Sequence, residues 1–436
     1  MSALSVAPQS VAAGLEHEVL LPRSWKLPVA LSVFAVVALL GFGLSLPADE
    51  VSKVSIVTGN HWLGTVAFTV PALTAVLVLG AIMVVLVGVA WWSAITRTTH
   101  IGKIRLGSWV GIIFGICFVL AFLLWAVAGR NGSLQLTSLL SGALFLSVPL
   151  IFGAMSGAVC EHVGVINVAI EGQLLTGAFL AAVIGAYAQN AWVGLLAAPI
   201  AGALLGSLLA LFAVRYWVDH IIVGVVLNVL ASGLTGYLFS TVLSHSAAAA
   251  TPVALPTWKI PVLCEIPIIG PVLFAQNALV YIMYAVVIVL QIMLFRSQWG
   301  LRLRACGEHP RAADTVGIKV NRTRIRNTIL GGAIAGLGGA YFTVANGLAF
   351  GKDMSAGRGF IALAAMILGG WKPKGALVAA LLFGFADNLQ NALGVVGVEV
   401  PSQFMLMAPY LVTIVAVAGL VGKVRAPAME GKPYMG

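Results

Sequence analysis

Charged residues are scarce in this chain. Only 9% of its 436 residues are Asp, Glu, Lys or Arg, and 60% are hydrophobic. Soluble domains usually carry about 25% charged residues, which they need to cover a surface that faces water. The composition therefore excludes an ordinary soluble globular protein.

Cysteines and catalytic motifs are also few. The four cysteines show neither CxxC nor metal-ligand spacing, so we expect no disulfide and no metal site. The phosphate-binding pattern GxxxxGK[ST] does not occur, and the nearest match, residues 347–353, has the wrong gap and ends in Asp. HExxH and GxSxG motifs are missing as well. We therefore predict that the chain is not an enzyme and binds no cofactor of its own.

Long apolar runs are abundant. Segments of about 20 apolar residues recur along the whole chain, and each is long enough to cross a bilayer core about 30 Å thick. They are too long and too continuously apolar for the alternating strands of a membrane barrel. We predict an all-α polytopic membrane protein with about 12 hydrophobic spans, some of them short or broken. The predicted spans are 27–47, 66–94, 107–128, 137–158, 163–188, 191–214, 221–243, 275–295, 326–346, 357–370, 375–393 and 404–422.

Basic residues are distributed unevenly between the two sides of these spans. The formal net charge is +10, and 19 of the 24 Lys and Arg residues fall on one side if the N-terminus is cytoplasmic. Such a bias is the positive-inside rule of membrane proteins. It predicts that both termini are cytoplasmic. Because membrane orientation already accounts for the basic charge, we expect no nucleic-acid partner.

The stretch GEHPRAADTVGI, residues 307–318, lies in the most basic predicted cytoplasmic loop, 296–326. Pro310 suits the first turn of a helix and Gly317 suits its end, which predicts a short helix between them. A helix of about two turns is unstable alone in water, so flanking spans or a partner must hold it. From the residues alone, two roles stay open: a docking element for a partner, or a basic loop held against anionic lipid.

Four stretches together resemble one family of transport proteins. They read EHVGVINVAIEGQLLTGAF (161–179), WGLRLRACGEHPRAADTVGIKVNRTRIR (299–326), GGAIAGLGGAY (331–341) and SAGRGFIALAAMILGGWKPKGALVAALLFGFADNLQ (355–390). In this order they resemble the nucleoside or simple-sugar permease subunits of bacterial ABC importers, within the ribose and branched-chain amino-acid permease superfamily. The resemblance covers residues 132–425. His309 departs from the asparagine that is usual before the proline in this family.

The resemblance implies a role for the short helix, because in such permeases a cytoplasmic helix docks into a groove on the ATPase subunit. We expect Ala312 and Ala313 to face that groove, since small side chains permit close contact. The residues assigned to ATPase coupling are Gly307, Glu308, Pro310, Arg311, Ala312, Ala313, Asp314 and Gly317.

Polar residues inside the spans are the candidates for the substrate path. A carboxylate at mid-bilayer costs roughly 2.5–3.5 kcal/mol, so it normally faces a bundle interior or a watery path. Amides and carboxylates suit ribose hydroxyls, and phenyl rings suit a base. The alternative is bonding between helices, which we favour for Asn167 and Glu171, whereas Asn228 and Asp387 favour the path. The candidates are Asn167, Glu171, Asn228, Phe383, Phe385, Asp387, Gln390 and Asn391.

Interrupted helices are expected near two of these motifs. The run 357–370 has only about 14 residues, and the segment 160–167 interrupts an earlier apolar run. Paired interrupted helices in two halves of a transporter usually mark a site at the midplane. Glycines spaced four residues apart, at 332 and 336 and at 331 and 339 with Ala335, permit close approach of helices.

These observations predict a permease subunit of an ABC importer that forms the translocation path for nucleosides or related simple sugars. The alternative is an ion-coupled secondary transporter, which would show the same broken helices and buried carboxylates in its sequence. The implied location is a prokaryotic inner membrane. The implied partners are a cytoplasmic ABC ATPase that uses ATP, a second permease subunit, an extracytoplasmic substrate-binding lipoprotein and membrane lipid.

The predicted organisation has four parts. Residues 1–26 form a cytoplasmic tail, and 27–131 form an additional group of transmembrane segments outside the resemblance. Residues 132–425 form the permease core with the cytoplasmic loop 296–326, and 426–436 form a cytoplasmic C-terminal tail. We expect the additional segments to pack at the periphery or to serve a partner.

Overall fold

The computed structural model describes residues 25–56, 66–97, 100–101, 104–130, 132–243, 251–396, 407 and 425–435. Within this part, ten helices are long and apolar enough to cross a membrane, and α14 (Arg358–Leu368) is a shorter apolar helix. These eleven helices correspond to the first eleven predicted spans. The last predicted span, 404–422, lies outside the described residues apart from Met407. The all-α prediction is confirmed for the spans, and the count of about 12 was approximate.

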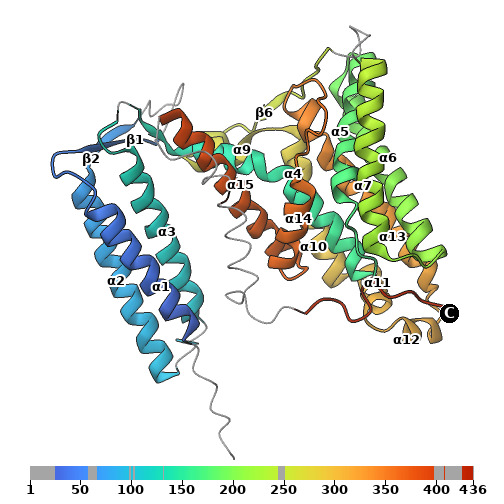
Figure 1. Ribbon diagram of the computed structural model, residues 1–436, viewed down its shortest axis with the longest axis horizontal. Coiled ribbons are helices and arrows are strands. Elements are labelled where there is room, and N and C mark those ends of the chain that lie inside the picture. Colours follow the sequence, from blue (N-terminus) through green and yellow to red (C-terminus); the bar gives the residue numbers. More distant parts are fainter. Residues whose placement is uncertain are drawn as a thin grey trace, which may run out of the picture. The chain divides into compact units, whose positions relative to one another are not determined.

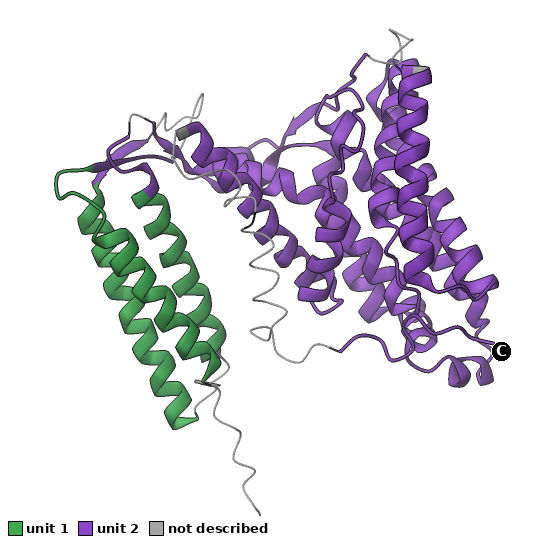
Figure 2. Cartoon of the chain, in the orientation of Figure 1, with its two compact units in different colours: residues 1–50, 71–125 green, residues 51–70, 126–436 purple. Residues whose placement is uncertain are grey.

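The chain forms two compact units (Figure 2). Unit 1, residues 1–50 and 71–125, contains three apolar helices: α1 (Lys26–Val36) with its continuation η1 (Val37–Gly43), α2 (Ala72–Thr96) and most of α3 (Leu106–Val127). The short strands β3 (His100–Ile101) and β4 (Ile104–Arg105) join α2 to α3. Aromatic contacts hold the unit together, because Phe42 lies against Phe118, Phe122 and Trp125.

Unit 2, residues 51–70 and 126–436, holds all the other helices. Its strands are short connections between them: β1 (Val51–Ser55) pairs with β2 (Ala67–Pro71) and, in parallel, with β5 (Leu134–Gln135). The helices of its membrane part are α4 (Leu136–His162), α5 (Ile170–Tyr187), α6 (Ala191–Ala210), η2 (Leu211–Arg215), α7 (His220–Leu238), η3 (Phe239–Leu243), α10 (Ala278–Arg296), α13 (Val320–Gly339), η5 (Tyr341–Ala345), α14 and α15 (Pro373–Val396).

The centre of unit 2 is α4, which α13, α14 and α15 contact (Figure 1). In α4, 89% of the most apolar 18-residue stretch is buried, and in α13 78%. By contrast, α7 exposes large apolar side chains along one whole face, and only 28% of its apolar stretch is buried. A face of this kind is suited to lipid or to another membrane subunit.

Glycines bring α6 and α13 into close contact. A Cβ atom on Gly202 would overlap the backbone of Gly332 and Gly336, and one on Gly336 would lie 2.5 Å from the Ala198 carbonyl oxygen. The predicted second row behaves in the same way, because a Cβ atom on Gly339 would overlap the backbone of α5 at Leu174. Both glycine rows therefore act as predicted, by letting helix backbones meet.

The connection from α7 to α10 is irregular. It contains β6 (Thr257–Lys259), the 3₁₀ turn η4 (Leu263–Glu265), the short helix α9 (Ile269–Phe274) and β7 (Ala275–Asn277), which pairs antiparallel with β6. The Tyr281 hydroxyl donates to the Trp258 carbonyl over 3.0 Å and ties this connection to α10.

Candidate translocation and coupling sites

The predicted interruption between α4 and α5 is present. Helix α4 ends at His162 and α5 begins at Ile170, which leaves backbone groups without helical partners. The Asn228 side chain on α7 satisfies two of them. Its Oδ1 accepts from the Gly172 N–H over 2.8 Å, and its Nδ2 donates to the Val168 carbonyl over 2.9 Å. Asn228 therefore holds the interruption in place.

Asn167 lies inside the interruption and is fully buried. Its Nδ2 donates to Ser156 Oγ and to Gln173 Oε1, each over 3.0 Å, and its Oδ1 accepts from Gln173 Nε2 over 3.3 Å. Both ends of the amide are thus used within the protein. Gln173, which sequence reasoning did not single out, completes this network one turn into α5.

Glu171 binds the start of α14. Its carboxylate accepts from Ser355 Oγ over 2.6 Å, from the Gly357 N–H over 2.8 Å and from the Gly359 N–H over 2.6 Å. The first N–H groups of a helix lack partners and carry a partial positive charge, so a carboxylate there is stabilising. Helix α14 has 11 residues, or about 16 Å, so it covers about half of a bilayer core. The predicted short helix is confirmed.

These contacts favour a role in bonding between helices for Asn167 and Glu171, as the sequence suggested. They favour the same role for Asn228, although the sequence favoured a place in the substrate path for that residue. All three side chains are occupied by groups of the same chain.

The α15 candidates differ among themselves. Phe383 is 1% exposed and belongs to the hydrophobic core, so it does not offer a ring face to a ligand, contrary to the prediction. Phe385, Asp387 and Gln390 are half-buried, and Asn391 is exposed. Asn391 lines a small cavity of about 260 Å³ together with Ser138 and Asn388.

Asp387, Gln390 and Asn391 are the polar candidates whose side chains make no hydrogen bond to a described residue, and Asp387 is the charged one. Among the described residues, no hydrogen bond reaches its carboxylate, and the cation that acts on it is Arg358 at the start of α14. The Arg358 guanidinium carbon also lies 5.6 Å from the centre of the Phe342 ring. Sequence reasoning did not single out Arg358, although it lies at the start of the predicted span 357–370. The motif SAGRGF contained it, but only the fold brings it to Asp387.

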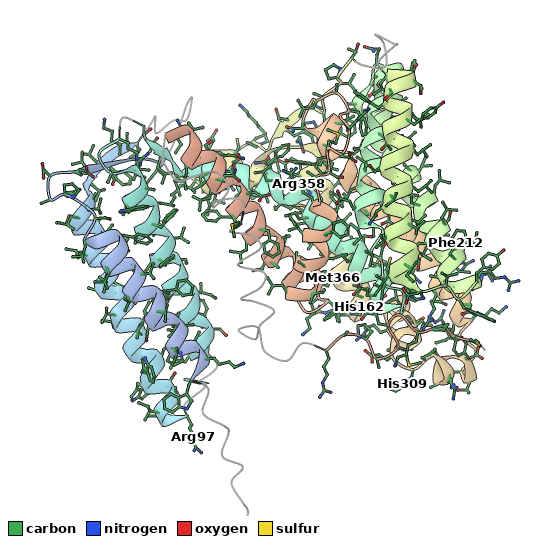
Figure 3. All side chains as sticks on the ribbon, viewed as in Figure 1. Arg97, His162, Phe212, His309, Arg358 and Met366 are labelled. Atoms are coloured by element: carbon green, nitrogen blue, oxygen red, sulfur yellow. The ribbon has the colours of Figure 1, made fainter. Side chains whose placement is uncertain are left out.

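The predicted short cytoplasmic helix is present as α12 (Pro310–Thr315), after α11 (Gln298–Glu308). Pro310 occupies its first turn, and Gly317 follows its end with φ of +84°, a backbone conformation that glycine adopts easily. Figure 3 shows His309, just before α12, at one end of unit 2 and Arg358 well away from it. The two sets of candidates are therefore separate sites.

The two alanines of α12 point in different directions. Ala312 is exposed, but Ala313 is 3% exposed and packs into the protein's own core. The expectation that both face a partner is therefore wrong for Ala313, since two adjacent helical residues project about 100° apart. Pro310 and Gly307 are buried as well, whereas Glu308, Arg311, Asp314 and Gly317 are exposed.

The predicted loop 296–326 is largely helical, because α13 already begins at Val320. Its basic residues line a groove of about 800 Å³ beside α12, with Arg302, Lys319, Arg322 and Arg326 in the lining. Arg324, expected among these cations, is instead 1% exposed. It donates to the Lys432 carbonyl over 2.8 Å and to the Cys306 carbonyl over 3.5 Å.

Comparison with known proteins accounts for this architecture. The family described as branched-chain amino acid transport system, permease component, matches residues 139–421. The guanosine ABC transporter permease protein NupQ of Bacillus subtilis (strain 168) is 36% identical over 309 residues, which cover 69% of this chain and 97% of the relative. The nucleoside ABC transporter permease protein NupC of Lactococcus lactis subsp. cremoris (strain MG1363) is 38% identical over 306 residues, which cover 68% of this chain and 96% of the relative.

A more distant relative is a putative glucose ABC transporter permease protein of Haloferax volcanii, 32% identical over 256 residues that cover 58% of this chain and 76% of the relative. No solved structure matches the chain. The family match extends over more than half of the chain and includes α5, α12, α14 and α15. The chain is therefore a multi-pass membrane protein that belongs to the permease-component family of branched-chain amino acid transport systems.

Proposed function

We propose that this protein is the transmembrane permease subunit of an ABC importer and that it carries nucleosides. The observation that carries the proposal is the similarity to guanosine and nucleoside permeases over 96–97% of their length, at 36–38% identity. Related simple sugars are the next candidates, because a putative glucose permease is similar at 32% identity. The ABC permeases among the relatives favour an importer over an ion-coupled transporter.

The energy source in this proposal is a separate ATPase subunit that docks at α12. The exposed side chains of α12 are Arg311, Ala312, Asp314 and Thr315, and the basic groove beside it suits an acidic surface on a partner. The permease itself holds no cofactor, and ATP is bound and hydrolysed by the partner. A second permease subunit and a substrate-binding protein complete the importer.

The substrate path in this proposal runs along the half-buried face of α15. The Asp387 carboxylate accepts hydrogen bonds from the sugar hydroxyls, and Gln390 and Asn391 lie one turn further along the same face of the helix. Phe385 is half-buried but projects about 200° away from Asp387 around the helix, so it does not replace Phe383 beside that carboxylate. Asn167, Glu171 and Asn228 hold the interrupted helices that border this path.

The orientation in this proposal follows from the basic residues. The groove with four cations, α12 and both termini lie on the cytoplasmic side of a prokaryotic inner membrane. The connection from α7 to α10 then lies on the outer side, where a substrate-binding protein delivers its cargo.

The orientation can be tested with a cysteine at Thr323 in a chain without its native cysteines. This cysteine should resist an impermeant thiol reagent added to intact cells. If it is labelled, the cytoplasmic and outer sides are the reverse of those proposed.

Uptake by a deletion strain tests the function. The strain should lose ATP-dependent uptake of a labelled nucleoside and regain it with the intact gene. Unlabelled purine nucleosides, pyrimidine nucleosides and free sugars are then added as competitors to rank the substrates. Unchanged nucleoside uptake in the deletion strain, under conditions in which the intact gene is expressed, would contradict the proposal.

A further inference from the structure

The last described residues, 425–435, lie across the end of unit 2 that carries α12, and the C-terminus lies beside α12 (Figure 1). We name residues 425–435 the C-terminal strap. The strap begins without regular secondary structure and contains a turn at Ala428–Gly431, closed by bonds from Glu430 N–H to the Pro427 carbonyl and from Lys432 N–H to the Met429 carbonyl. Its hydrogen bonds reach elements that are far apart in the sequence.

The strap binds the coupling region at three points. The Met429 N–H donates to the Gly307 carbonyl over 2.9 Å, and the Ala428 N–H donates to Glu308 Oε2 over 3.3 Å. The Tyr434 hydroxyl donates to Asp314 Oδ2 on α12 over 3.0 Å. The segment before α12 and α12 itself are thus both attached to the strap.

The strap also binds the interruption between α4 and α5. The Gly431 N–H donates to the Gly164 carbonyl over 3.1 Å. The carboxyl groups of Glu430 and Glu161 are neighbours, and Glu161 lies at the end of α4. Glu161 also accepts from the Trp371 indole N–H, in the turn between α14 and α15. One proton must lie between the two carboxyl groups, because two adjacent carboxylates repel each other.

A buried cation completes the attachment. Arg324, at the start of α13, donates to the Lys432 carbonyl on the strap and to the Cys306 carbonyl on α11. A buried guanidinium is costly unless its donors are satisfied, so this position depends on the strap. Asn321 on the same helix donates to the Tyr434 carbonyl over 3.4 Å.

We infer that the C-terminal strap couples α12 mechanically to the interruption between α4 and α5, with Tyr434 and Glu430 as its positioning residues. The strap is the one described segment that hydrogen-bonds α12, the end of α11, the start of α13 and the interruption together. A displacement of α12 is thereby transmitted to the helix ends that border the proposed path. The inference rests on the proposed coupling role of α12 and adds a second component to it.

The test uses the full-length permease in its importer, with variants that leave Arg324 intact. Tyr434→Phe removes only the hydroxyl that reaches Asp314. Glu430→Ala removes the partner of Glu161, whereas Glu430→Gln keeps a hydrogen-bonding group of the same size. Tyr216→Phe is the matched control, since Tyr216 is exposed and its ring lies against Phe212.

Two readouts are needed. The first is the rate at which a maleimide labels Ala312→Cys in inverted vesicles, with the four native cysteines replaced. The second is the amount of nucleoside taken up per ATP hydrolysed in reconstituted vesicles, at equal protein content. We expect Tyr434→Phe and Glu430→Ala to raise the labelling rate and lower uptake per ATP, while Glu430→Gln and Tyr216→Phe match the unchanged protein. A merely structural tail would lower protein content and leave uptake per ATP the same.

Unchanged labelling and unchanged uptake per ATP in Tyr434→Phe and Glu430→Ala would overturn the inference. Ala312→Arg separates this failure from failure of the proposed function. If Ala312→Arg abolishes uptake while the strap variants have no effect, α12 still couples to an ATPase and only the strap is excluded. If Ala312→Arg transports normally, the coupling role of α12 itself is wrong.

Discussion

Two groups of polar side chains within unit 2 differ in how fully their hydrogen bonds are used. Around the interruption before α5, Asn167, Glu171 and Asn228 bind seven groups of the same chain between them. On α15, the Asp387 carboxylate has Arg358 as its charged neighbour and no hydrogen bond from the described residues. The first group is built to hold broken helices together, and the second has capacity left for a ligand.

The difference matters because polar groups in a membrane cannot rely on water. An unpaired buried donor or acceptor costs about 1–3 kcal/mol, so each one is normally satisfied inside the protein. A carboxylate that accepts no hydrogen bond from the protein therefore indicates a ligand site more strongly than a carboxylate whose hydrogen bonds are already made. Sequence alone cannot separate the two kinds, since both appear as acidic residues within apolar runs.

The largest effect is expected at Glu171. Glu171→Leu leaves the Ser355 hydroxyl and the N–H groups of Gly357 and Gly359 without their acceptor, at about 1–3 kcal/mol each. The protein should be recovered at a much lower level and should unfold at a lower temperature in detergent. Glu171→Gln keeps one acceptor and should lie between Leu and the unchanged protein. If Glu171→Leu is recovered at a normal level and transports normally, Glu171 does not hold the interrupted helices together.

A smaller loss of stability is expected at Asn228. Asn228→Leu unpairs the Gly172 N–H and the Val168 carbonyl, two groups instead of three. Val229→Leu, on the exposed apolar face of the same helix, is the control and should have no effect. Thermal unfolding of the purified proteins measures both. If Asn228→Leu is stable but inactive in transport, Asn228 belongs to the substrate path, and the contrast between the two groups of side chains is weaker.

Glu430 is intermediate between these two groups, because its carboxyl group is paired only while it shares a proton with Glu161. Burial raises the pKa of Glu430, while its hydrogen bond with Glu161 acts in the opposite direction. The raised pKa means that the docked strap binds the proton more tightly than the released strap does. The attachment is therefore complete below the ordinary glutamate value of about 4.3 and weakens as pH rises through the raised value.

This pH dependence can be measured with a fluorophore on Met435→Cys, which reports release of the strap as increased mobility. The charged group that acts on Glu430 is Glu161 on α4. Arg324 on α13 and Glu308 on α11 bind other residues of the strap, and Lys432 belongs to the strap itself. Mobility should increase with pH in the unchanged protein and stay constant in Glu430→Gln. An equal pH response in both proteins would show that another group is responsible.

The smallest effect on transport is expected from removal of residues 1–131, which contain unit 1 and the strands β1 and β2. The family match begins at residue 139, and 68–69% of this chain covers 96–97% of the guanosine and nucleoside permeases. A chain that starts at Gly132 should therefore keep most of its nucleoside uptake per folded protein. Loss of uptake at normal protein level would show that the three N-terminal helices take part in transport.

Much of the fold was predictable from the sequence because membrane spans need long apolar runs. The spans, the short helix α14, the glycine contacts of α13 and the helix at Pro310 were all expected, since each depends on neighbouring residues. The site was less predictable. The burial of Phe383 and Ala313 depends on which helices pack against them, and local sequence does not contain that information.

The residues that sequence reasoning missed share one property. Arg358, Arg324 and Gln173 acquire their roles from partners 6 to 108 positions away or on other helices, such as Lys432 for Arg324. Helix periodicity could not assign them. A buried arginine within a basic loop looks the same in sequence as the exposed arginines around it, and only the position of the strap distinguishes Arg324.

The central claim is that the open carboxylate of Asp387 serves the substrate. Its most direct test is nucleoside uptake per folded protein in Asp387→Asn, with Asp219→Asn as control, because Asp219 caps α7 and asparagine caps equally well. Loss of a charge-assisted hydrogen bond of about 1.5–3 kcal/mol predicts uptake about ten- to a hundredfold lower at low substrate concentration. Protein level and unfolding temperature should stay unchanged. Normal uptake by well-folded Asp387→Asn would contradict the claim.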